Sequence, residues 1–423
     1  MNKTAAFYTL GCKVNQYETE ALANLFRQGG YEVVDFSDKA DVYVINTCTV
    51  THLSDRKSRQ MIRRAKKNNP EGIVAVMGCY AQIKWKDIRK IPGVDLILGT
   101  QDRLKVVELV EKIKTGKLDG VDKEINGDNK EYREAGELDK KTKQVERKTA
   151  VTRGKPVVVV KELGNAHFEE MPLGEIQRTR AFIKIEDGCE HFCTYCLVPH
   201  ARGPVRSRDI ENILADADRM AYHGAKEIVL TGVNLGAYGK DLEGDVSLAE
   251  VILKMQEISE IKRIRLSSLE PTDFTMELIE TIEKSDKVCR HLHIPLQSGD
   301  DYILKKMNRR YEVDEYRKLV CYLRYLMPDL ALTTDVMVGF PGEKEVNFNN
   351  TYEFVKEMAF SRLHVFKYSP RPGTPAGQFP DQVSPEDKDY RSRKLSELGS
   401  ELSRQYSKRF VGRKVEVLFE EEK

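Results

Sequence analysis

Short apolar segments alternate with helical segments along the first hundred residues of this 423-residue chain. Four of them have the length and composition of buried strands: AAFYTL (5–10), DVYVIN (41–46), GIVAVM (72–77) and VDLIL (94–98). Between the first two lies a segment with apolar residues at helical spacing, which ends at Gly29-Gly30. Buried strands joined by helices favour a doubly wound parallel α/β sheet, which we assign to residues 1–116.

Six further strand candidates lie between residues 177 and 384, again with helical segments between them. They are 181–186, 227–233, 263–269, 291–296, 331–339 and 362–369. The loop after each one is polar or glycine-rich, and repeated βα units of this spacing predict a partial TIM-like barrel with six units instead of eight. Active sites of such barrels lie at the carboxyl ends of the strands, so we expect functional residues in these loops.

The remaining segments differ in composition. Residues 117–176 are expected to be a linker, because their first part is highly charged and poor in large apolar residues. Within it, PVVVVKEL (156–163) is a candidate short strand without an evident partner. An amphipathic helix is expected at 385–409. Residues 410–423 include the β-like stretch GRKVEVLFEEEK and are expected to start a small β domain that this sequence does not complete.

Composition gives no sign of a membrane protein. The sequence has no run of about 18 apolar residues, and its N-terminus lacks the pattern of a signal peptide. The net charge is only +2, so the chain as a whole shows no strong nucleic-acid signal. We expect a cytoplasmic protein, in which eight cysteines are better explained as ligands than as disulfides.

Three of these cysteines form one short run, Cys189-x-x-x-Cys193-x-x-Cys196, in the loop after the first barrel strand. Three thiolates can hold three irons of a cubane [4Fe–4S] cluster, and the missing fourth ligand leaves one iron open for chemistry. The alternative is a zinc ion held by the same cysteines and His200. A zinc knuckle is usually a small module, whereas this run lies inside a long α/β pattern.

Three other cysteines follow the first three strands of the N-terminal segment: Cys12, Cys48 and Cys79. The carboxyl ends of parallel strands meet at one edge of a sheet, so we expect these residues to converge. Single buried cysteines are common in protein cores. Three in equivalent positions instead favour a second three-cysteine cluster site.

These motifs resemble those of the radical S-adenosylmethionine (SAM) methylthiotransferases over nearly the whole chain. TLGCKVNQYETE, NTCTVT and MGCYAQ resemble the N-terminal cluster domain of that family, and GCEHFCTYCLVP resembles its SAM-cluster loop. SSLEP, HIPLQSGD, TTDVMVGFPGE and YSPRPGTPA resemble the barrel. Family members usually end in a complete TRAM domain, of which only the start is expected here.

The resemblance implies two [4Fe–4S] clusters. The cluster on Cys189, Cys193 and Cys196 would bind SAM and generate a 5′-deoxyadenosyl radical. The auxiliary cluster on Cys12, Cys48 and Cys79 would deliver sulfur. Two SAM molecules would be used in each turnover, one as methyl donor and one as radical source.

Other site residues carry two possible interpretations. Tyr195 either lies against the SAM adenine or simply packs in the loop. Thr231, Gly232 and Asn234 either contact the methionyl amine or form a glycine-rich turn. Gln297, Ser298 and Asp335 are candidates for polar contacts on the same face. Cys289 and Cys321 form no constellation, and neither do His191, His291 and His293.

The family has three branches with different substrates. They act on threonylcarbamoyladenosine in tRNA, on isopentenyladenosine in tRNA, and on an aspartate of a ribosomal protein. GCKVNQYETE and SSLEP are most similar to the threonylcarbamoyladenosine branch. The partners implied are tRNA and a reducing electron donor such as flavodoxin or ferredoxin, and we expect a monomer. A zinc-containing nucleic-acid-binding protein is the remote alternative.

Basic residues cluster after the cysteine loop, on the helix expected at 54–68, and after the fourth barrel strand. Such clusters bind nucleic-acid phosphates favourably, because binding releases counterions. A solvated helix face nevertheless explains at least half of these basic residues. Arg202 lies close to the cysteine loop in sequence. We therefore expect it to pair with a substrate carboxylate, which a threonylcarbamoyl group carries.

Overall fold

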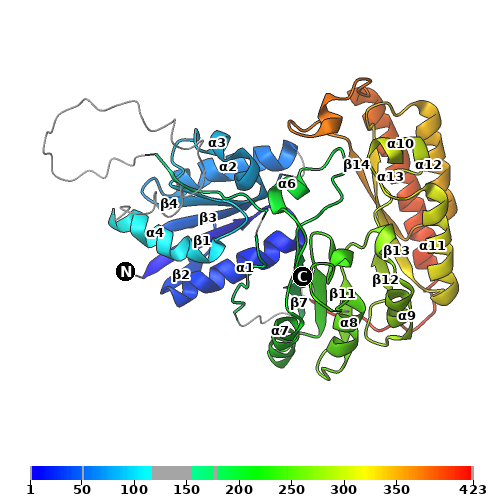
Figure 1. Cartoon of the computed structure of the whole chain (residues 1–423), viewed down its shortest axis with the longest axis horizontal. Coiled ribbons are helices and arrows are strands. Elements are labelled where there is room, and N and C mark those ends of the chain that lie inside the picture. Colours follow the sequence, from blue (N-terminus) through cyan, green and yellow to red (C-terminus); the bar gives the residue numbers. More distant parts are fainter. Residues whose placement is uncertain are drawn as a thin grey trace, which may run out of the picture. The chain divides into compact units, whose positions relative to one another are not determined.

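The computed structural model describes residues 2–49, 52–116, 155–164, 166–174, 179–244 and 246–420. The chain divides into two compact units (Figure 1). The first comprises Met1–Gly11, Thr19–Cys48 and Leu53–Glu162. The second comprises Cys12–Glu18, Thr49–His52 and Leu163–Lys423.

The first unit contains a six-stranded parallel sheet with the order β2-β1-β3-β4-β5-β6. Its strands are β1 (Lys3–Thr9), β2 (Tyr31–Val34), β3 (Val42–Thr47), β4 (Ile73–Gly78), β5 (Leu96–Leu98) and β6 (Val157–Val159). The helices along this part of the chain are α1 (Lys13–Gln28), α2 (His52–Asn68), α3 (Cys79–Ile88) and α4 (Val106–Thr115). The order of the first five strands is that of a doubly wound sheet. The strands are added in one direction from β1 to β2 and in the opposite direction from β3 onwards, so the switch point lies between β1 and β3.

One strand of this sheet, β2, lies outside the sequence prediction, and β6 falls within the short strand expected at 156–163, whose partner the sequence does not give. β2 is a four-residue strand at the sheet edge, too short to give a periodic signal. β6 lies within the expected linker at 117–176 and pairs in parallel with β5, as Leu96 with Val157. The first unit therefore runs on to Glu162, although residues 117–154 lie outside the described residues.

The second unit contains the six expected barrel strands. They are β7 (Arg180–Lys184), β10 (Glu227–Thr231), β11 (Arg263–Leu266), β12 (His291–His293), β13 (Ala331–Val338) and β14 (Arg362–Lys367). They form two parallel sheets, β11-β10-β7 and β12-β13-β14. Single parallel bridges, Ile264 with Val288 and Ser268 with His293, join the two, so the strands follow one another in chain order as predicted for a partial barrel.

Helices α7–α12 separate the strands. They are α7 (Ile210–Tyr222), α8 (Leu248–Gln256), α9 (Met276–Lys284), α10 (Asp301–Lys306), α11 (Val313–Leu326) and α12 (Glu345–Met358). Several begin at side chains that accept hydrogen bonds from the first turn, as Asp209 does for α7 and Thr275 for α9. Short 3-10 turns lie at η1 (Arg103–Lys105), η3 (Leu235–Ala237), η4 (Pro271–Asp273) and η5 (Pro375–Gln378).

The C-terminal part of the chain agrees with the sequence prediction only in its helix. α13 (Pro385–Lys408) matches the helix expected at 385–409 and is capped by the Ser384 side chain. The expected β-stretch after it is not formed among the described residues: residues 413–420 belong to no strand. Within the part of the chain that the structure describes, none of the helices combines the length and apolar character needed to cross a membrane.

One buried carboxylate joins the first three barrel strands. Glu227 at the start of β10 is 0% exposed, and its Oε1 lies 2.8 Å from Arg180 Nε on β7 and 2.6 Å from Arg265 Nε on β11. Burial alone raises the pKa of this carboxyl, but the two guanidinium groups more than compensate, so its pKa is lowered.

Replacing this carboxylate should destabilise the second unit. We expect Glu227→Gln to lower the free energy of unfolding by roughly 3 kcal/mol, because Arg265 loses its carboxylate partner and Arg180 keeps only Glu420. A folded pKa below the unfolded value means stability that is present above about pH 4.3 and lost as the pH falls through the folded pKa. In urea unfolding, the difference in the free energy of unfolding between wild type and variant should therefore become smaller as the pH falls into the acid range.

The matched control is Glu280→Gln, which removes an exposed ion pair with Lys284 on the surface of α9. It should leave the unfolding midpoint unchanged. Equal midpoints for Glu227→Gln and wild type at pH 7 would contradict a stabilising role for the Glu227 ion pairs.

Candidate functional site

The three-cysteine run forms a loop whose two ends meet. It follows β8 (Glu186–Asp187), and the chain returns through α6 (Val198–Arg202) to β9 (Arg206–Ser207), which pairs with β8. The Cys189 amide donates a hydrogen bond to the Gly203 carbonyl at 3.0 Å, which closes the loop. Gly188 has φ +102°, and a Cβ there would lie 1.8 Å from the Pro204 carbonyl oxygen, so only glycine fits.

The cysteine sulfurs receive hydrogen-bond donors. The Val198 amide lies 3.4 Å from Cys196 Sγ, and Arg309 Nη1 lies 3.3 Å from Cys193 Sγ. Arg309 is fixed in turn by an ion pair with Glu270. Donors to sulfur tune the potential of an iron–sulfur cluster, so this environment fits cluster-ligating thiolates.

Burial sets the protonation state of these thiols when no metal is bound. It raises the pKa of Cys189 and Cys196 to about 12, and the neighbouring thiols add to this effect. Such thiols are neutral near pH 7 unless a bound cation compensates their charge.

A single zinc ion on these cysteines fits less well. Among the described residues, only His293, Asp335 and His364 bring three metal-ligating atoms within 4.8 Å of one another. Cys189, Cys193, Cys196 and His200 do not form such a group, although ligands of one ion must. A cubane is larger than one ion and separates its thiolates further, so the geometry favours the cluster over the zinc alternative.

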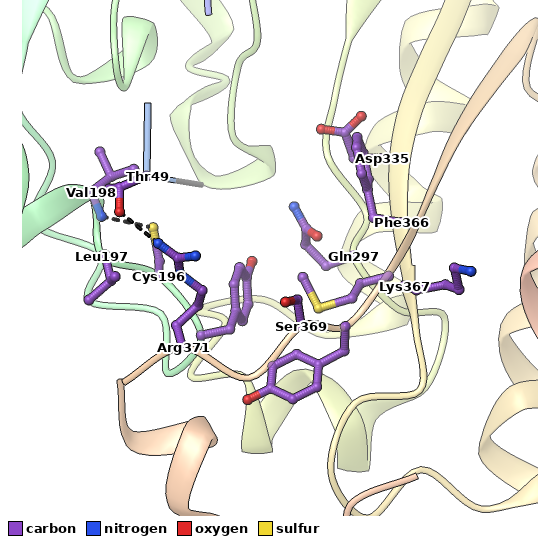
Figure 2. Close-up of a pocket in the computed structure, with 13 residues that line it drawn as sticks. Thr49, Cys196, Leu197, Val198, Gln297, Asp335, Phe366, Lys367, Ser369 and Arg371 are labelled. Carbon is purple, nitrogen blue, oxygen red and sulfur yellow. Dashed lines mark hydrogen bonds between the residues drawn. The ribbon is translucent and has the colours of Figure 1, made fainter. Parts of the chain in front are cut away.

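A pocket of about 210 Å³ lies beside the last cysteine (Figure 2). It brings together four of the residues predicted from the sequence: Tyr195, Cys196, Gln297 and Asp335. The rest of its wall is formed by Thr49, Leu197, Val198, Met337, Phe366, Lys367, Tyr368, Ser369 and Arg371. The Tyr195 ring also packs edge-on against Phe340, with centroids 6.4 Å apart, so it lines the pocket and packs in the loop at once.

Gln297 enters the pocket from an unusual backbone conformation. Its φ of +62° lies in the left-handed region, which costs a non-glycine residue about 1–2 kcal/mol. The conformation is held from both sides, because its amide donates to the Asp335 carbonyl and its own carbonyl accepts from the Met337 amide, each at 2.8 Å. Backbone strain of this kind concentrates at functional sites.

Ser298 lies elsewhere. Its side chain is 0% exposed, and its Oγ lies 3.2 Å from Thr351 Oγ1 on α12. It does not line the pocket, so the structure gives it a packing role instead of the expected polar contact.

Two buried acceptor atoms lie beside the turn after β10. Glu186 is 0% exposed and accepts the Asn234 amide hydrogen at 2.7 Å through Oε2. Glu186 Oε1 and Asn234 Oδ1 are buried and receive no hydrogen bond within the described residues. An ammonium group supplies three donors, so these atoms fit the amine of SAM.

The neighbouring residues explain why this turn is tight. A Cβ on Gly232 would lie 2.5 Å from Glu186 Oε2, and Thr231 is buried, with its carbonyl bonded to the Ile185 amide. Of the three predicted residues, Asn234 is the one with a buried side-chain acceptor that receives no hydrogen bond within the described residues. Glu186 was missed, although its place directly before the cysteine loop is a signal in the sequence.

Comparisons with known proteins agree with these motifs. Residues 4–99 match the family described as uncharacterized protein family UPF0004, and residues 183–355 match the radical SAM superfamily. A threonylcarbamoyladenosine tRNA methylthiotransferase MtaB of Bacillus subtilis is 43% identical over 99% of this chain and 85% of the relative. This chain belongs to the radical SAM methylthiotransferase family.

Other relatives have a different substrate in their names. A tRNA-2-methylthio-N(6)-dimethylallyladenosine synthase of Pelotomaculum thermopropionicum is 36% identical over 98% of this chain and 86% of the relative. Among solved structures, the radical SAM methyltransferase TsrM of Kitasatospora setae has a TM-score of 0.60 at 15% identity, covering 89% of this chain and 77% of that one. This structural likeness supports the fold alone.

In this methylthiotransferase Arg202 is not available for a substrate. It is 1% exposed, and its guanidinium donates to Glu18, Asp187 and Asn15. Lys184 Nζ joins the same group, 2.8 Å from Asp187 Oδ2. The expected contact between Arg202 and a substrate carboxylate is therefore not supported, because the side chain is buried in an internal ion-pair network.

Two of the auxiliary cysteines follow neighbouring strands of the methylthiotransferase. Thr47 at the end of β3 pairs with Gly78 at the end of β4, so Cys48 and Cys79 leave the sheet at the same edge. Both are buried. Cys12 is exposed and comes three residues after β1, and its Sγ lies 3.8 Å from Asn15 Oδ1.

The backbone of Gln297 gives a testable prediction. Gln297→Gly and Gln297→Ala both remove the pocket side chain, so both should lose activity to a similar extent. Only the glycine relieves the positive φ, so we expect Gln297→Ala to be less stable than Gln297→Gly by about 1 kcal/mol. Urea unfolding of the two variants measures this difference, and equal stability would show that the backbone is unstrained.

Proposed function

We propose that this methylthiotransferase replaces the hydrogen at C2 of N6-threonylcarbamoyladenosine in tRNA, next to the anticodon, by a methylthio group. The similarity to MtaB proteins over 99% of the chain supports this substrate, at 43% identity for Bacillus subtilis and 37% for Aquifex aeolicus. The product is 2-methylthio-N6-threonylcarbamoyladenosine.

The reaction calls for two metal clusters and SAM. The hydrogen at C2 is not acidic, so no acid–base pair in the site can remove it directly. When bound, the clusters and SAM supply the radical and the sulfur that this substitution requires. We propose that Cys189, Cys193 and Cys196 hold the SAM cluster and that Cys12, Cys48 and Cys79 hold the auxiliary cluster.

The described residues then have the following roles. Tyr195, Gln297 and Asp335 line the space for SAM and the adenosine, while Glu186 and Asn234 accept hydrogen bonds from the SAM amine. Arg309 holds a positive charge beside the cysteine loop. Thr231 and Gly232 shape the turn after β10.

The pocket favours a substrate that carries a carboxylate. Arg371 lies on its wall and donates a hydrogen bond to Thr49 Oγ1 at 2.7 Å, whereas Lys367 on the same wall pairs with Asp389. A guanidinium and a carboxylate form strong charge-assisted hydrogen bonds. The threonylcarbamoyl group has such a carboxylate, whereas dimethylallyl is uncharged, so Arg371 favours the first substrate over the second.

The larger partners follow from the same proposal. We propose that tRNA phosphates contact the exposed basic side chains of α2: Arg56, Lys57, Arg63, Arg64 and Lys67. Two of the basic residues on this helix are excluded from the set, because Lys66 pairs with Asp95 and Arg59 donates to Tyr80. A reduced flavodoxin or ferredoxin would supply electrons to a monomeric enzyme.

Iron content tests the cluster assignment. Anaerobically reconstituted wild type should hold about eight irons per chain, and the Cys189/Cys193/Cys196→Ala variant about four. The Cys12/Cys48/Cys79→Ala variant should also hold about four. The Cys289→Ala variant is the control and should keep the full content. Four irons in wild type and none in the first variant would exclude a cluster on Cys12, Cys48 and Cys79.

Substrate preference tests the reaction. With dithionite and SAM, the enzyme should methylthiolate tRNA that carries threonylcarbamoyladenosine at least tenfold faster than tRNA that carries isopentenyladenosine, as measured by mass spectrometry of nucleosides. Arg371→Gln should reduce this preference roughly tenfold or more, since a hydrogen bond to a charged group is worth about 1.5–3 kcal/mol. Arg393→Gln, on the exposed side of α13, is the control.

Three outcomes would overturn parts of the proposal. Preference for isopentenyladenosine would assign the enzyme to the branch that modifies isopentenyladenosine in tRNA. Modification of a ribosomal-protein aspartate, with both tRNAs unmodified, would assign it to the protein-modifying branch. If Arg371→Gln leaves the substrate preference unchanged, Arg371 does not contact the substrate carboxylate, although the proposed reaction still stands.

A further inference from the structure

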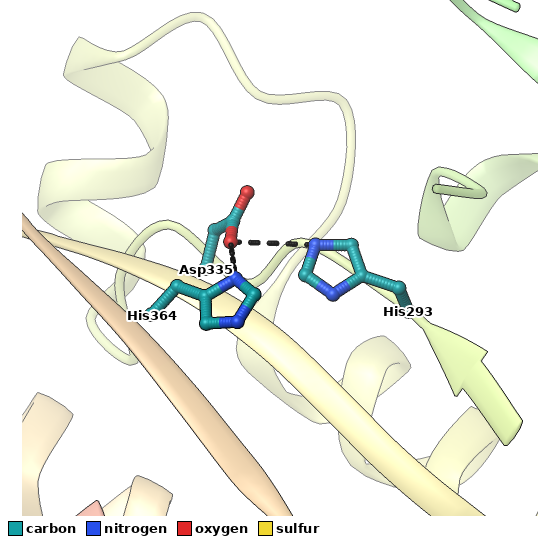
Figure 3. A group of neighbouring side chains, drawn as sticks. All are labelled: His293, Asp335 and His364. Atoms are coloured by element: carbon teal, nitrogen blue, oxygen red, sulfur yellow. Dashed lines mark hydrogen bonds and ion pairs between the residues drawn. The ribbon is translucent and has the colours of Figure 1, made fainter. Parts of the chain in front are cut away.

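Two histidines and one aspartate meet on three neighbouring barrel strands, outside the cysteine loop (Figure 3). His293 Nε2 lies 3.3 Å from Asp335 Oδ1, and His364 Nδ1 lies 3.2 Å from the same oxygen. Within the described ranges of the chain, no other three residues bring ligating atoms this close.

Strand register explains the meeting. Asp335 on β13 pairs directly with His364 on β14, while His293 on β12 pairs with Thr333, two residues before Asp335. Side chains two residues apart in a strand project from the same face. The three groups therefore converge on one face of the sheet, which sequence spacing alone does not reveal.

The surroundings of His293 resemble the second layer of a metal site. Its Nδ1 lies 2.9 Å from Thr333 Oγ1. A histidine that binds a metal usually donates its other ring N–H to an oxygen, which fixes the ring and its tautomer. With Nδ1–H donated to Thr333, the lone pair of Nε2 is directed to the side where Asp335 and His364 lie.

Two of the three distances between the ligating atoms fit one ion, and the two histidine nitrogens lie within 4.8 Å of each other. Nitrogen and oxygen ligands lie about 2.0–2.2 Å from zinc, and in a tetrahedron such ligands are about 3.3–3.5 Å apart. The two distances to Asp335 Oδ1 are at or just under this range. The imidazole rings are stacked, with centroids 5.6 Å apart and planes 30° apart, so neither ring blocks the other from a shared ion.

We propose that His293, Asp335 and His364 bind one divalent transition-metal ion, with zinc as the representative ion. Neutral imidazoles and a carboxylate are ligands that zinc prefers, and three protein ligands leave a fourth position open. Asp335 also lines the pocket, so the open position lies next to it and would take water or an anionic oxygen such as a carboxylate.

Zinc binding to the reconstituted holoenzyme tests the site without using the methylthiotransferase reaction. After equilibrium dialysis against zinc chloride, elemental analysis should give one zinc per chain with unchanged iron. X-ray absorption at the zinc edge should show nitrogen and oxygen neighbours and no sulfur. This edge is specific to zinc, so the iron clusters do not contribute to the signal.

Variants assign the ion to these residues. Asp335→Asn and His364→Phe should abolish stoichiometric zinc binding, and His364 is 44% exposed, so its replacement should leave the fold intact. Thr333→Val keeps all three ligands but removes the partner of His293, so the affinity should fall about 10- to 100-fold. His223→Gln, at the end of α7, is the matched control and should bind zinc like wild type.

The proposal fails if wild type takes up no zinc, if sulfur appears among the zinc neighbours, or if His364→Phe binds zinc as tightly as wild type. Each result is independent of substrate turnover. A protein that binds zinc but modifies no tRNA would overturn the proposed function and leave the metal site standing.

Discussion

A buried group of charges holds the cysteine loop in place. Asp187 directly precedes the loop and Arg202 closes it, and their side chains pair in the protein interior with Lys184 alongside. Burial alone raises the pKa of Asp187, but Arg202 and Lys184 overcome this effect and keep the carboxyl ionised. Because breaking a buried pair leaves an uncompensated charge, both ends of the loop are fixed relative to each other. The position of the three thiols depends on this constraint.

Much of the barrel was predictable because its strands are apolar, separated by helices and followed by polar loops. Gln297 and Asp335 were found for that reason. β2 was missed because a four-residue strand carries no periodic signal, and the partner of β6 could not be predicted because only the sheet shows which strand it pairs with. The interior position of Arg202 was equally invisible, because burial depends on neighbours that are distant in sequence.

The proposed histidine site also could not be predicted from sequence spacing. His293, Asp335 and His364 lie far apart in the sequence. Strand pairing brings the two histidines to Asp335, a residue that also lines the pocket. One carboxylate thus belongs to both the pocket wall and the proposed ion site. A ligand in the pocket and an ion on the histidines would therefore affect each other's affinity through a shared group.

The described barrel sheet ends at β14, which pairs only with β13 among the described strands. A ring of eight strands closes on itself and fills its centre with side chains. Six strands leave an edge, and here that edge carries two residues of the pocket wall, Phe366 and Lys367. A strand with one neighbour is held by hydrogen bonds on one side alone, so the part of the pocket wall formed by Phe366 and Lys367 depends on a single strand pairing.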